Sequence, residues 1–238
     1  MKSRLHKAAP IVYARVKSVP ACGRRGERLS EPRLPQGTLM FVVFDIGNVL
    51  VRWNPRNLFR KTIKDEARME RFLATALAMD FVSLTDIAAD FSKAVAERAR
   101  AFPEFARELH LFDERWVETI GGPIEENVAL MRRLKAAGRP VYALSNFATV
   151  KFALARRMFD FLGEFDHAVI SGHVGVVKPD PRIFQILFER SGRRPEELVF
   201  VDDQLKNIEA ARSLGMPSIH YLDGVDLEKE LSRRGALP

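Results

Sequence analysis

The stretch FVVFDIGNVLV, residues 41–51, decides the fold of this chain. Its four apolar residues, Phe41–Phe44, predict a short buried strand that ends on the carboxylate of Asp45. The tight sequence Ile46-Gly47-Asn48 follows before apolar residues resume. Because open α/β sheets build their sites at the carboxyl ends of strands, Asp45 is a candidate nucleophile or metal ligand. Taken alone, an Asp in this position is more often an ordinary turn residue or helix cap.

Three later segments repeat this arrangement of an apolar run followed by polar side chains. The runs and their polar residues are 141–144 with Ser145-Asn146, 168–170 with Lys178 after a loop, and 198–201 with Asp202-Asp203. Helical patterns separate the runs. This alternation predicts an α/β fold with a parallel, doubly wound sheet and right-handed crossovers. Each of these polar residues has an ordinary structural explanation by itself, but all four groups in this order favour a shared site.

These residues resemble the four sequence motifs of the haloacid dehalogenase superfamily. Asp45 corresponds to motif I, Ser145 to motif II, Lys178 to motif III, and VDDQLKN at residues 201–207 to motif IV. The resemblance extends from Met40 to the C-terminus and implies a Rossmann-like core with an inserted α-helical cap. The form D-x-G-N-V of motif I is most similar to the branch that includes sugar-1-phosphate phosphatases.

The resemblance implies a Mg²⁺-dependent phosphatase that hydrolyses a small phosphorylated metabolite, with a sugar phosphate as one candidate. Asp45 would attack phosphorus and form an aspartyl phosphate, which splits hydrolysis into two displacement steps. Ser145 and the backbone amide of Asn146 would bind phosphoryl oxygens, while Lys178 would balance the negative charge. Oxygen ligands suit a hard cation. The family pattern assigns the Mg²⁺ ligands to Asp45, the backbone carbonyl of Gly47, Asp202 and Asp203.

Gly47 departs from most phosphatases of the superfamily, which carry a second Asp there as general acid and then base. Glycine can do neither, and loss of a general acid typically costs about 10²–10⁴-fold for a poor leaving group. Two explanations are open. Either the substrate has a good leaving group, such as an anomeric sugar phosphate, or water and a cap residue handle the proton.

Two other functions compete with the phosphatase. A 2-haloacid dehalogenase needs neither a metal nor a second Asp, so Gly47 fits that chemistry. However, the pair Asp202-Asp203 suits a cation site better than a metal-free site for an anionic acid. The third candidate is a non-catalytic scaffold that binds a phosphometabolite or a protein, and the retention of every phosphate-handling residue disfavours it.

The sequence pattern divides the chain into three parts. We expect a disordered basic extension at residues 1–39, an α/β core at 40–53 and 121–238, and a helical cap at 54–120. Apolar residues at helical spacing predict the cap helices, two of them over 87–100 and 103–111. Pro123 is expected to begin the next helix of the core. Such a cap can close over a site, exclude water and select the substrate.

Charge and composition exclude several classes of partner. The net charge is +7, but residues 1–39 hold nine basic and two acidic side chains and account for all of it. The rest is neutral, which argues against a nucleic-acid partner. No apolar run approaches the roughly 20 residues that span a bilayer. The single cysteine, Cys22, is compatible with a reducing compartment, so we expect a cytoplasmic protein without a membrane partner.

The N-terminal extension is rich in Pro and Gly and shows little helical or strand periodicity. Met40 lies immediately before the first expected strand, so it is a candidate for the natural start of the protein. One competing interpretation is an ordinary disordered extension. Another is an organelle transit peptide, which the Arg-rich, acid-poor composition fits but the weak amphipathic pattern does not.

Overall fold

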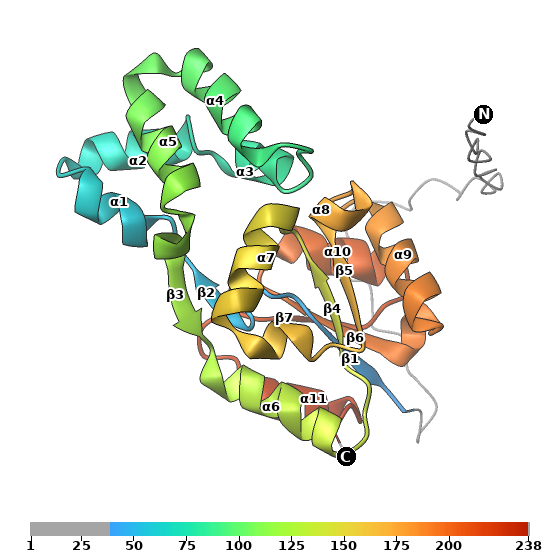
Figure 1. Ribbon diagram of the computed structural model, residues 1–238. Helices are drawn as coiled ribbons and strands as arrows, with labels where there is room; N and C mark the ends of the chain where they lie inside the picture. The colour runs from blue at the N-terminus through green and yellow to red at the C-terminus, as the bar shows by residue number, and fades with distance from the viewer. Residues whose placement is uncertain (1–38, 238) are drawn as a thin grey trace, which may run out of the picture. The chain divides into compact units, whose positions relative to one another are not determined.

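The computed structural model describes residues 39–237 (Figure 1). The expectations for the N-terminal extension therefore fall, apart from its last residue, outside the described part. A parallel five-stranded sheet with the order β5-β4-β1-β6-β7 forms the centre of the described residues. Its strands are β1 (Phe41–Phe44), β4 (Tyr142–Ser145), β5 (His167–Ile170), β6 (Leu198–Asp202) and β7 (Ser218–His220).

Helices cover both faces of this sheet, which confirms the doubly wound α/β fold. Strand β1 is buried on both sides, and its residues alternate between two hydrophobic clusters: Val42 and Phe44 face one, Phe41 and Val43 the other. The first cluster includes residues of α6 (Glu125–Ala136), α7 (Thr149–Met158) and α11 (Leu227–Arg233). The second includes residues of α9 (Pro181–Ser191) and α10 (Leu205–Ser213).

A helical insert separates β2 (Val51–Trp53) from β3 (Ile120–Pro123), and we use this name for residues 56–119. Asp65 and Asp90 cap the amino ends of two of its helices by accepting hydrogen bonds from backbone amides. Buried residues of the insert belong to the same hydrophobic cluster as one face of the sheet. Its elements are α1 (Arg56–Thr62), α2 (Glu66–Ala74), α3 (Met79–Thr85), α4 (Phe91–Ala101), η1 (Pro103–Phe105), α5 (Ala106–Glu114) and η2 (Trp116–Thr119).

Several expected element boundaries are wrong. Pro123 does not begin a helix but ends strand β3, which pairs antiparallel with β2, and α6 starts at Glu125. The helix expected over 87–100 is α4, which starts only at Phe91, where Asp90 provides the cap. The region expected at 103–111 is divided between the short η1 and α5. Asp180 caps the amino end of α9 by accepting a hydrogen bond from the Arg182 amide, and Pro181 is its first residue.

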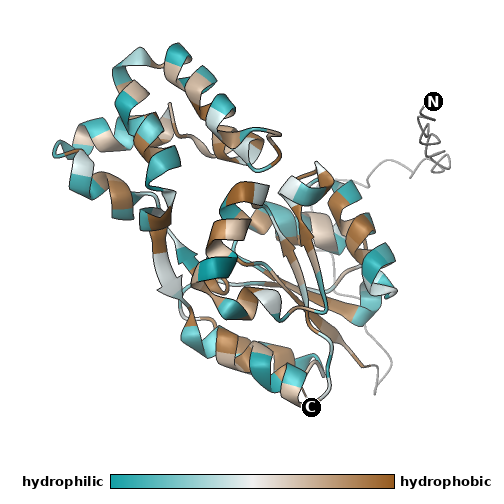
Figure 2. Cartoon of the chain, in the orientation of Figure 1, coloured by the Kyte–Doolittle hydropathy of each residue, from teal (hydrophilic) through white to brown (hydrophobic). Residues whose placement is uncertain are grey.

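The remaining short elements connect these units: η3 (Asp160–Gly163), α8 (Ser171–Val174) and η4 (Pro195–Glu197). In Figure 2 the strands of the sheet are largely hydrophobic, whereas most surrounding helices carry both hydrophilic and hydrophobic residues. Within residues 39–237, no helix combines the length and the hydrophobicity required to cross a bilayer.

Candidate active site

The carboxyl ends of three adjacent strands bring the expected site residues together. Asp45 follows β1, while Ser145 and Asp202 are the last residues of β4 and β6, the two neighbours of β1. Carboxylate oxygens of Asp45, Asp202 and Asp203 all lie within 4.8 Å of one another. The first-strand aspartate and the acidic pair therefore converge as the sequence predicts, close enough to share one cation.

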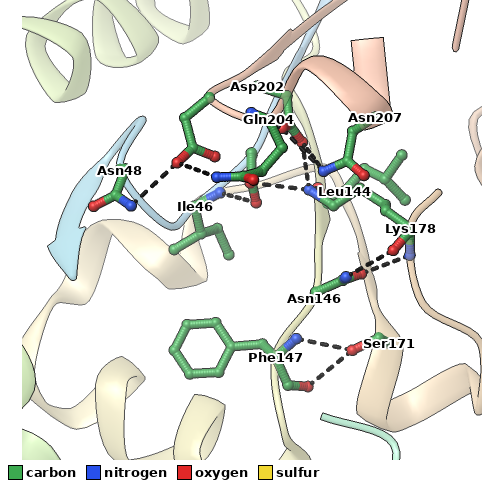
Figure 3. A network of polar contacts seen from close by, with 12 residues as sticks. Ile46, Asn48, Leu144, Asn146, Phe147, Ser171, Lys178, Asp202, Gln204 and Asn207 are labelled. Carbon is green, nitrogen blue, oxygen red and sulfur yellow. Dashed lines mark hydrogen bonds and ion pairs between the residues drawn. The ribbon is translucent and has the colours of Figure 1, made fainter. Parts of the chain in front are cut away.

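Lys178 lies at the centre of the site with only 2% of its surface exposed. Its ammonium nitrogen Nζ is 2.7 Å from Asp202 Oδ2 and 3.0 Å from Asp45 Oδ2, and it donates a 2.9 Å hydrogen bond to the backbone carbonyl of Leu144. All three ammonium donors thus have an acceptor, as burial of a charge requires. Figure 3 shows this network.

The electrostatics of the site follow from this burial. Burial raises the pKa of Asp45, against the charge of Lys178, and the neighbouring Asp202 and Asp203 raise it further. Burial acts to lower the pKa of Lys178, but the charges of Asp202 and Asp45 outweigh it, so this pKa lies above its usual value. Lys178 is therefore protonated at neutral pH.

The two residues of the acidic pair have different surroundings. Asp202 is fully buried, and its carboxylate accepts hydrogen bonds from Lys178, from Asn207 Nδ2 (3.0 Å) and from the backbone amide of Gln204 (2.7 Å). Asp203 is partly exposed, and its Oδ2 accepts from the side chains of Asn48 (3.1 Å) and Gln204 (2.9 Å). The Asp202 carboxylate is thus fixed inside the protein, whereas Asp203 is partly accessible to solvent.

The donor set fits a divalent cation. Three carboxylates against one ammonium leave an excess of two negative charges, which a divalent cation would neutralise. In addition, the carbonyl oxygen Oδ1 of Asn207 has no hydrogen-bond partner among the described residues, although only 2% of Asn207 is exposed. Hard oxygen ligands of this kind suit Mg²⁺, whose retained water molecules need hydrogen-bond acceptors nearby.

Ser145, Asn146 and Gly47 line the same cavity as Asp45. A hydrogen bond from Ser145 acts to lower the pKa of Asp45. The side chain of Asn146 brackets the backbone of Lys178: its Oδ1 accepts from the Lys178 amide (2.7 Å), and its Nδ2 donates to the Lys178 carbonyl (3.0 Å). The sequence predicts a role only for the backbone amide of Asn146, not this contact between its side chain and the backbone of Lys178.

The cavity above these residues has a volume of about 560 Å³ and extends into the helical insert. Polar residues at the carboxyl ends of the strands line one part of the cavity, and the helical insert contributes mainly apolar residues together with Arg56, Glu70, Ser83, Thr85 and Asp86. The apolar lining includes Trp53, Leu73, Leu77, Val82, Phe91, Phe112, Trp116 and Phe147. Such a mixed lining is typical of sites that bind an organic ligand with one polar group.

Two further residues of the site were not predicted from the sequence. Asn48 adopts a left-handed backbone (φ 54°) and uses its side chain to bridge Asp203 and the amide of Trp53. Asp86, at the end of α3, lines the cavity from the helical insert. The motif D-x-G-N contains Asn48 and could have indicated its role, whereas nothing around Asp86 distinguishes it from other surface carboxylates.

Known proteins show the same fold and related sequences. The sesquiterpene phosphatase astK of Aspergillus oryzae is 26% identical over 200 residues, which cover 82% of this chain and 95% of that protein. The (S)-2-haloacid dehalogenase of Pseudomonas fluorescens is 30% identical over 95 residues, covering 40% of this chain and 42% of the dehalogenase. A HAD family enzyme of Bacteroides thetaiotaomicron, solved in complex with magnesium and inorganic phosphate, superposes with a TM-score of 0.59 at 21% identity, covering 81% of this chain and 98% of that one.

The superfamily assignment rests on a match that covers most of the chain. The family model described as haloacid dehalogenase-like hydrolase matches residues 39–215, which include strands β1 to β6 and all the site residues named above. The structural match agrees with the parallel, doubly wound sheet. Motifs I, II and IV lie at the ends of β1, β4 and β6, and Lys178 of motif III lies in the loop between α8 and α9. The chain therefore belongs to the haloacid dehalogenase-like hydrolases.

Proposed function

We propose that this hydrolase is a Mg²⁺-dependent phosphatase that cleaves a phosphate monoester through an aspartyl phosphate on Asp45. The observation that carries the proposal is the cluster of three carboxylates, two of which (Asp45 and Asp202) are paired with the buried ammonium of Lys178. A carboxylate attacks a phosphate dianion only where the repulsion between them is neutralised. Lys178 and a divalent cation together would supply the required positive charge.

In this mechanism each residue of the site has a separate task. Asp45 Oδ attacks phosphorus, and the ester oxygen leaves on the opposite side. Lys178 holds one oxygen of Asp45 and neutralises charge on the phosphoryl group. Ser145 and the amide of Asn146 donate hydrogen bonds to phosphoryl oxygens. Mg²⁺ would be held by Asp45, Asp202, Asp203 and the Gly47 carbonyl, and it would supply electrostatic stabilisation of the transition state.

The substrate class follows from the cavity. A small phosphorylated metabolite fits a volume of about 560 Å³, and the D-x-G-N-V motif is the argument for a sugar 1-phosphate. The apolar side chains that the helical insert contributes argue instead for an alcohol with hydrocarbon surface, because that surface would be buried against them, although polar residues of the insert also line the cavity. The similarity to a sesquiterpene phosphatase supports the same choice. We therefore favour a phosphate ester with an apolar part.

The dehalogenase alternative is disfavoured by the acidic pair. A 2-haloacid carries a carboxylate of its own, which would have to bind beside Asp45 and the partly exposed Asp203 without a cation. At about 4 Å, two like unit charges repel by several kcal/mol at an effective dielectric constant of 20. The same argument disfavours a metal-free binding scaffold.

Phosphate release from a panel of phosphorylated metabolites, sugar phosphates and alkyl phosphates tests the proposal. The assay is run with Mg²⁺ and with EDTA, on the wild type, on Asp45→Asn and on Asp80→Asn as a control. Asp80 is an exposed carboxylate of α3 that does not line the cavity. We expect Mg²⁺-dependent release that Asp45→Asn abolishes and Asp80→Asn leaves unchanged. Halide release from 2-chloropropionate without metal would replace the phosphatase with the dehalogenase.

A further inference from the structure

Because position 47 is a glycine, no side chain there can transfer the proton that the reaction requires. When the ester bond breaks, the departing alkoxide needs a proton, and the water that later attacks the phosphoenzyme must lose one. Gly47 has no side chain to serve either need, and an added Cβ there would meet no heavy atom within 4 Å. The position is therefore sterically open, and an ester with a poor leaving group would need another group to act in its place.

Asp86 is the carboxylate that the helical insert contributes to the cavity. It lines the same cavity as Asp45 and Lys178, and it is partly exposed there. Its side chain accepts a hydrogen bond from the backbone amide of Ala148, and its backbone carbonyl accepts one from Ser171 Oγ (3.2 Å). These contacts hold Asp86 against the loop that follows Ser145, whose hydroxyl is a candidate phosphoryl ligand.

Ser171 connects Asp86 to this loop a second time. Its hydroxyl oxygen accepts a 2.8 Å hydrogen bond from the backbone amide of Phe147, in addition to its contact with the Asp86 carbonyl. Ser171 is fully buried, so this connection is shielded from water. A residue of the helical insert is thus connected to the loop after Ser145 by one direct hydrogen bond, from the Ala148 amide, and by a bridge through Ser171.

The charge state of Asp86 suits proton transfer. Burial raises its pKa to about 7, against the amide of Ala148 and the charge of Lys178, which both act to lower it. Of the other charged groups that line the cavity, Lys151 is paired with Asp113 at 2.6 Å. A carboxyl group with a pKa near the working pH can both donate and accept a proton.

We propose that Asp86 is the general acid and base of this phosphatase, acting from the helical insert in place of the missing side chain at position 47. The inference rests on the proposed function. In the first step the bond from Asp45 to phosphorus forms, the ester P–O bond breaks, and the departing oxygen takes the Asp86 proton. In the second step the Asp86 carboxylate takes a proton from water as that water attacks phosphorus, and the Asp45–phosphorus bond breaks. The products are the alcohol and inorganic phosphate, with Asp86 protonated again.

A purely structural role for Asp86 makes a different prediction. The hydrogen bond from Ala148 lies at the amino end of α7, so the carboxylate could simply cap that helix. Asp86→Asn keeps an oxygen that can accept this hydrogen bond but has no proton to transfer. Loss of a cap would affect all substrates alike, whereas loss of a general acid affects esters according to their leaving group.

The test compares single-turnover alcohol release from hexyl phosphate, a poor leaving group, with release from 4-nitrophenyl phosphate, a good one. With Mg²⁺ present, we expect Asp86→Asn to slow alcohol release from hexyl phosphate by about 10²–10⁴-fold. Release from 4-nitrophenyl phosphate should slow by less than about tenfold. The double variant Gly47→Asp, Asp86→Asn should release hexanol from hexyl phosphate at least about tenfold faster than the single variant Asp86→Asn. Asp80→Asn, near the amino end of α3, whose carboxyl end Asp86 caps, is the matched control and should change neither rate.

The wild type provides a second readout that needs no variant. The rate of alcohol release from hexyl phosphate should fall as the pH rises through about 7, where Asp86 loses its proton. The same decrease with pH should be much smaller for 4-nitrophenyl phosphate. Equal losses for both esters in Asp86→Asn, without rescue by Gly47→Asp, would overturn the proposal. Absence of Mg²⁺-dependent release from either ester by the wild type would instead defeat the proposed function itself.

Discussion

Replacement of Lys178 by methionine removes the one buried cation that the structure places among three carboxylates. Methionine is similar in length and apolar, so the substitution deletes the charge without opening a large cavity. The Nζ atom contacts Asp202 at 2.7 Å, Asp45 at 3.0 Å and the Leu144 carbonyl at 2.9 Å. Each of these acceptors loses its ammonium donor in the variant.

The magnitude follows from burial. At a separation of 3 Å and an effective dielectric constant of 20, each ion pair is worth about 5 kcal/mol before desolvation is subtracted. Removal of one partner from a buried ion pair costs about 3–5 kcal/mol, because the remaining charge stays buried. We therefore expect Lys178→Met to lower the free energy of unfolding by about 3–5 kcal/mol without Mg²⁺. The loss should be smaller at pH 5 than at pH 8, because protonation neutralises the stranded carboxylates.

Urea unfolding in EDTA measures this effect. The control is Lys135→Met, which removes a partly exposed pair with Asp166 (3.0 Å) and should cost about 0–1 kcal/mol. Addition of Mg²⁺ should recover more stability in Lys178→Met than in the wild type, because the cation replaces the missing charge. If Lys178→Met costs no more than Lys135→Met, the buried charge cluster does not exist as described and the reasoning is refuted.

Three further predictions follow from contacts around the site. Asn207→Leu removes the two 3.0 Å hydrogen bonds to Asp202, so we expect Mg²⁺ affinity to fall about 10–100-fold, measured by calorimetry; an unchanged affinity would exclude an orienting role. Asn146→Ala leaves the backbone amide and carbonyl of Lys178 without partners and should cost about 1–3 kcal/mol in urea unfolding, with a lower kcat; a stability equal to wild type would contradict this. Because folding raises the pKa of Asp86 from 3.8 to about 7, the folded state binds more protons between these values, and stability falls as the pH rises. The free energy of unfolding of Asp86→Asn should therefore decrease less between pH 5 and pH 8 than that of the wild type. An equal decrease in both proteins would refute the raised pKa of Asp86.

The parts of the fold that local sequence dictates were predictable. The run of Phe41–Phe44 ending in Asp45 is a buried strand because it is apolar without interruption, and β1 has those bounds. Helix α9 begins at Pro181 because Asp180 can cap it and proline fits the first turn. The convergence of the acidic pair on Asp45 follows from the parallel sheet, since β6 is a direct neighbour of β1.

The parts that depend on distant contacts were not predictable. Strand β3 (Ile120–Pro123) contains two glycines and a proline, which are depleted in strands, and it forms only because β2 pairs with it. Asp86 is an ordinary carboxylate in the sequence and acquires its surroundings from Ala148 and Ser171, at least 62 residues away along the chain. No local pattern encodes such an arrangement.

The central claim is that Asp45 forms a covalent phosphoryl intermediate, and trapping that intermediate tests it most directly. The enzyme is mixed with an ester that it turns over in Mg²⁺, quenched in acid within one turnover, digested and examined by mass spectrometry. The account predicts one phosphoryl group on Asp45, in the peptide that contains residues 41–51, and none in the Asp45→Asn variant. Steady turnover with no phosphoryl group on Asp45 at any quench time, or turnover that survives Asp45→Asn, would contradict it.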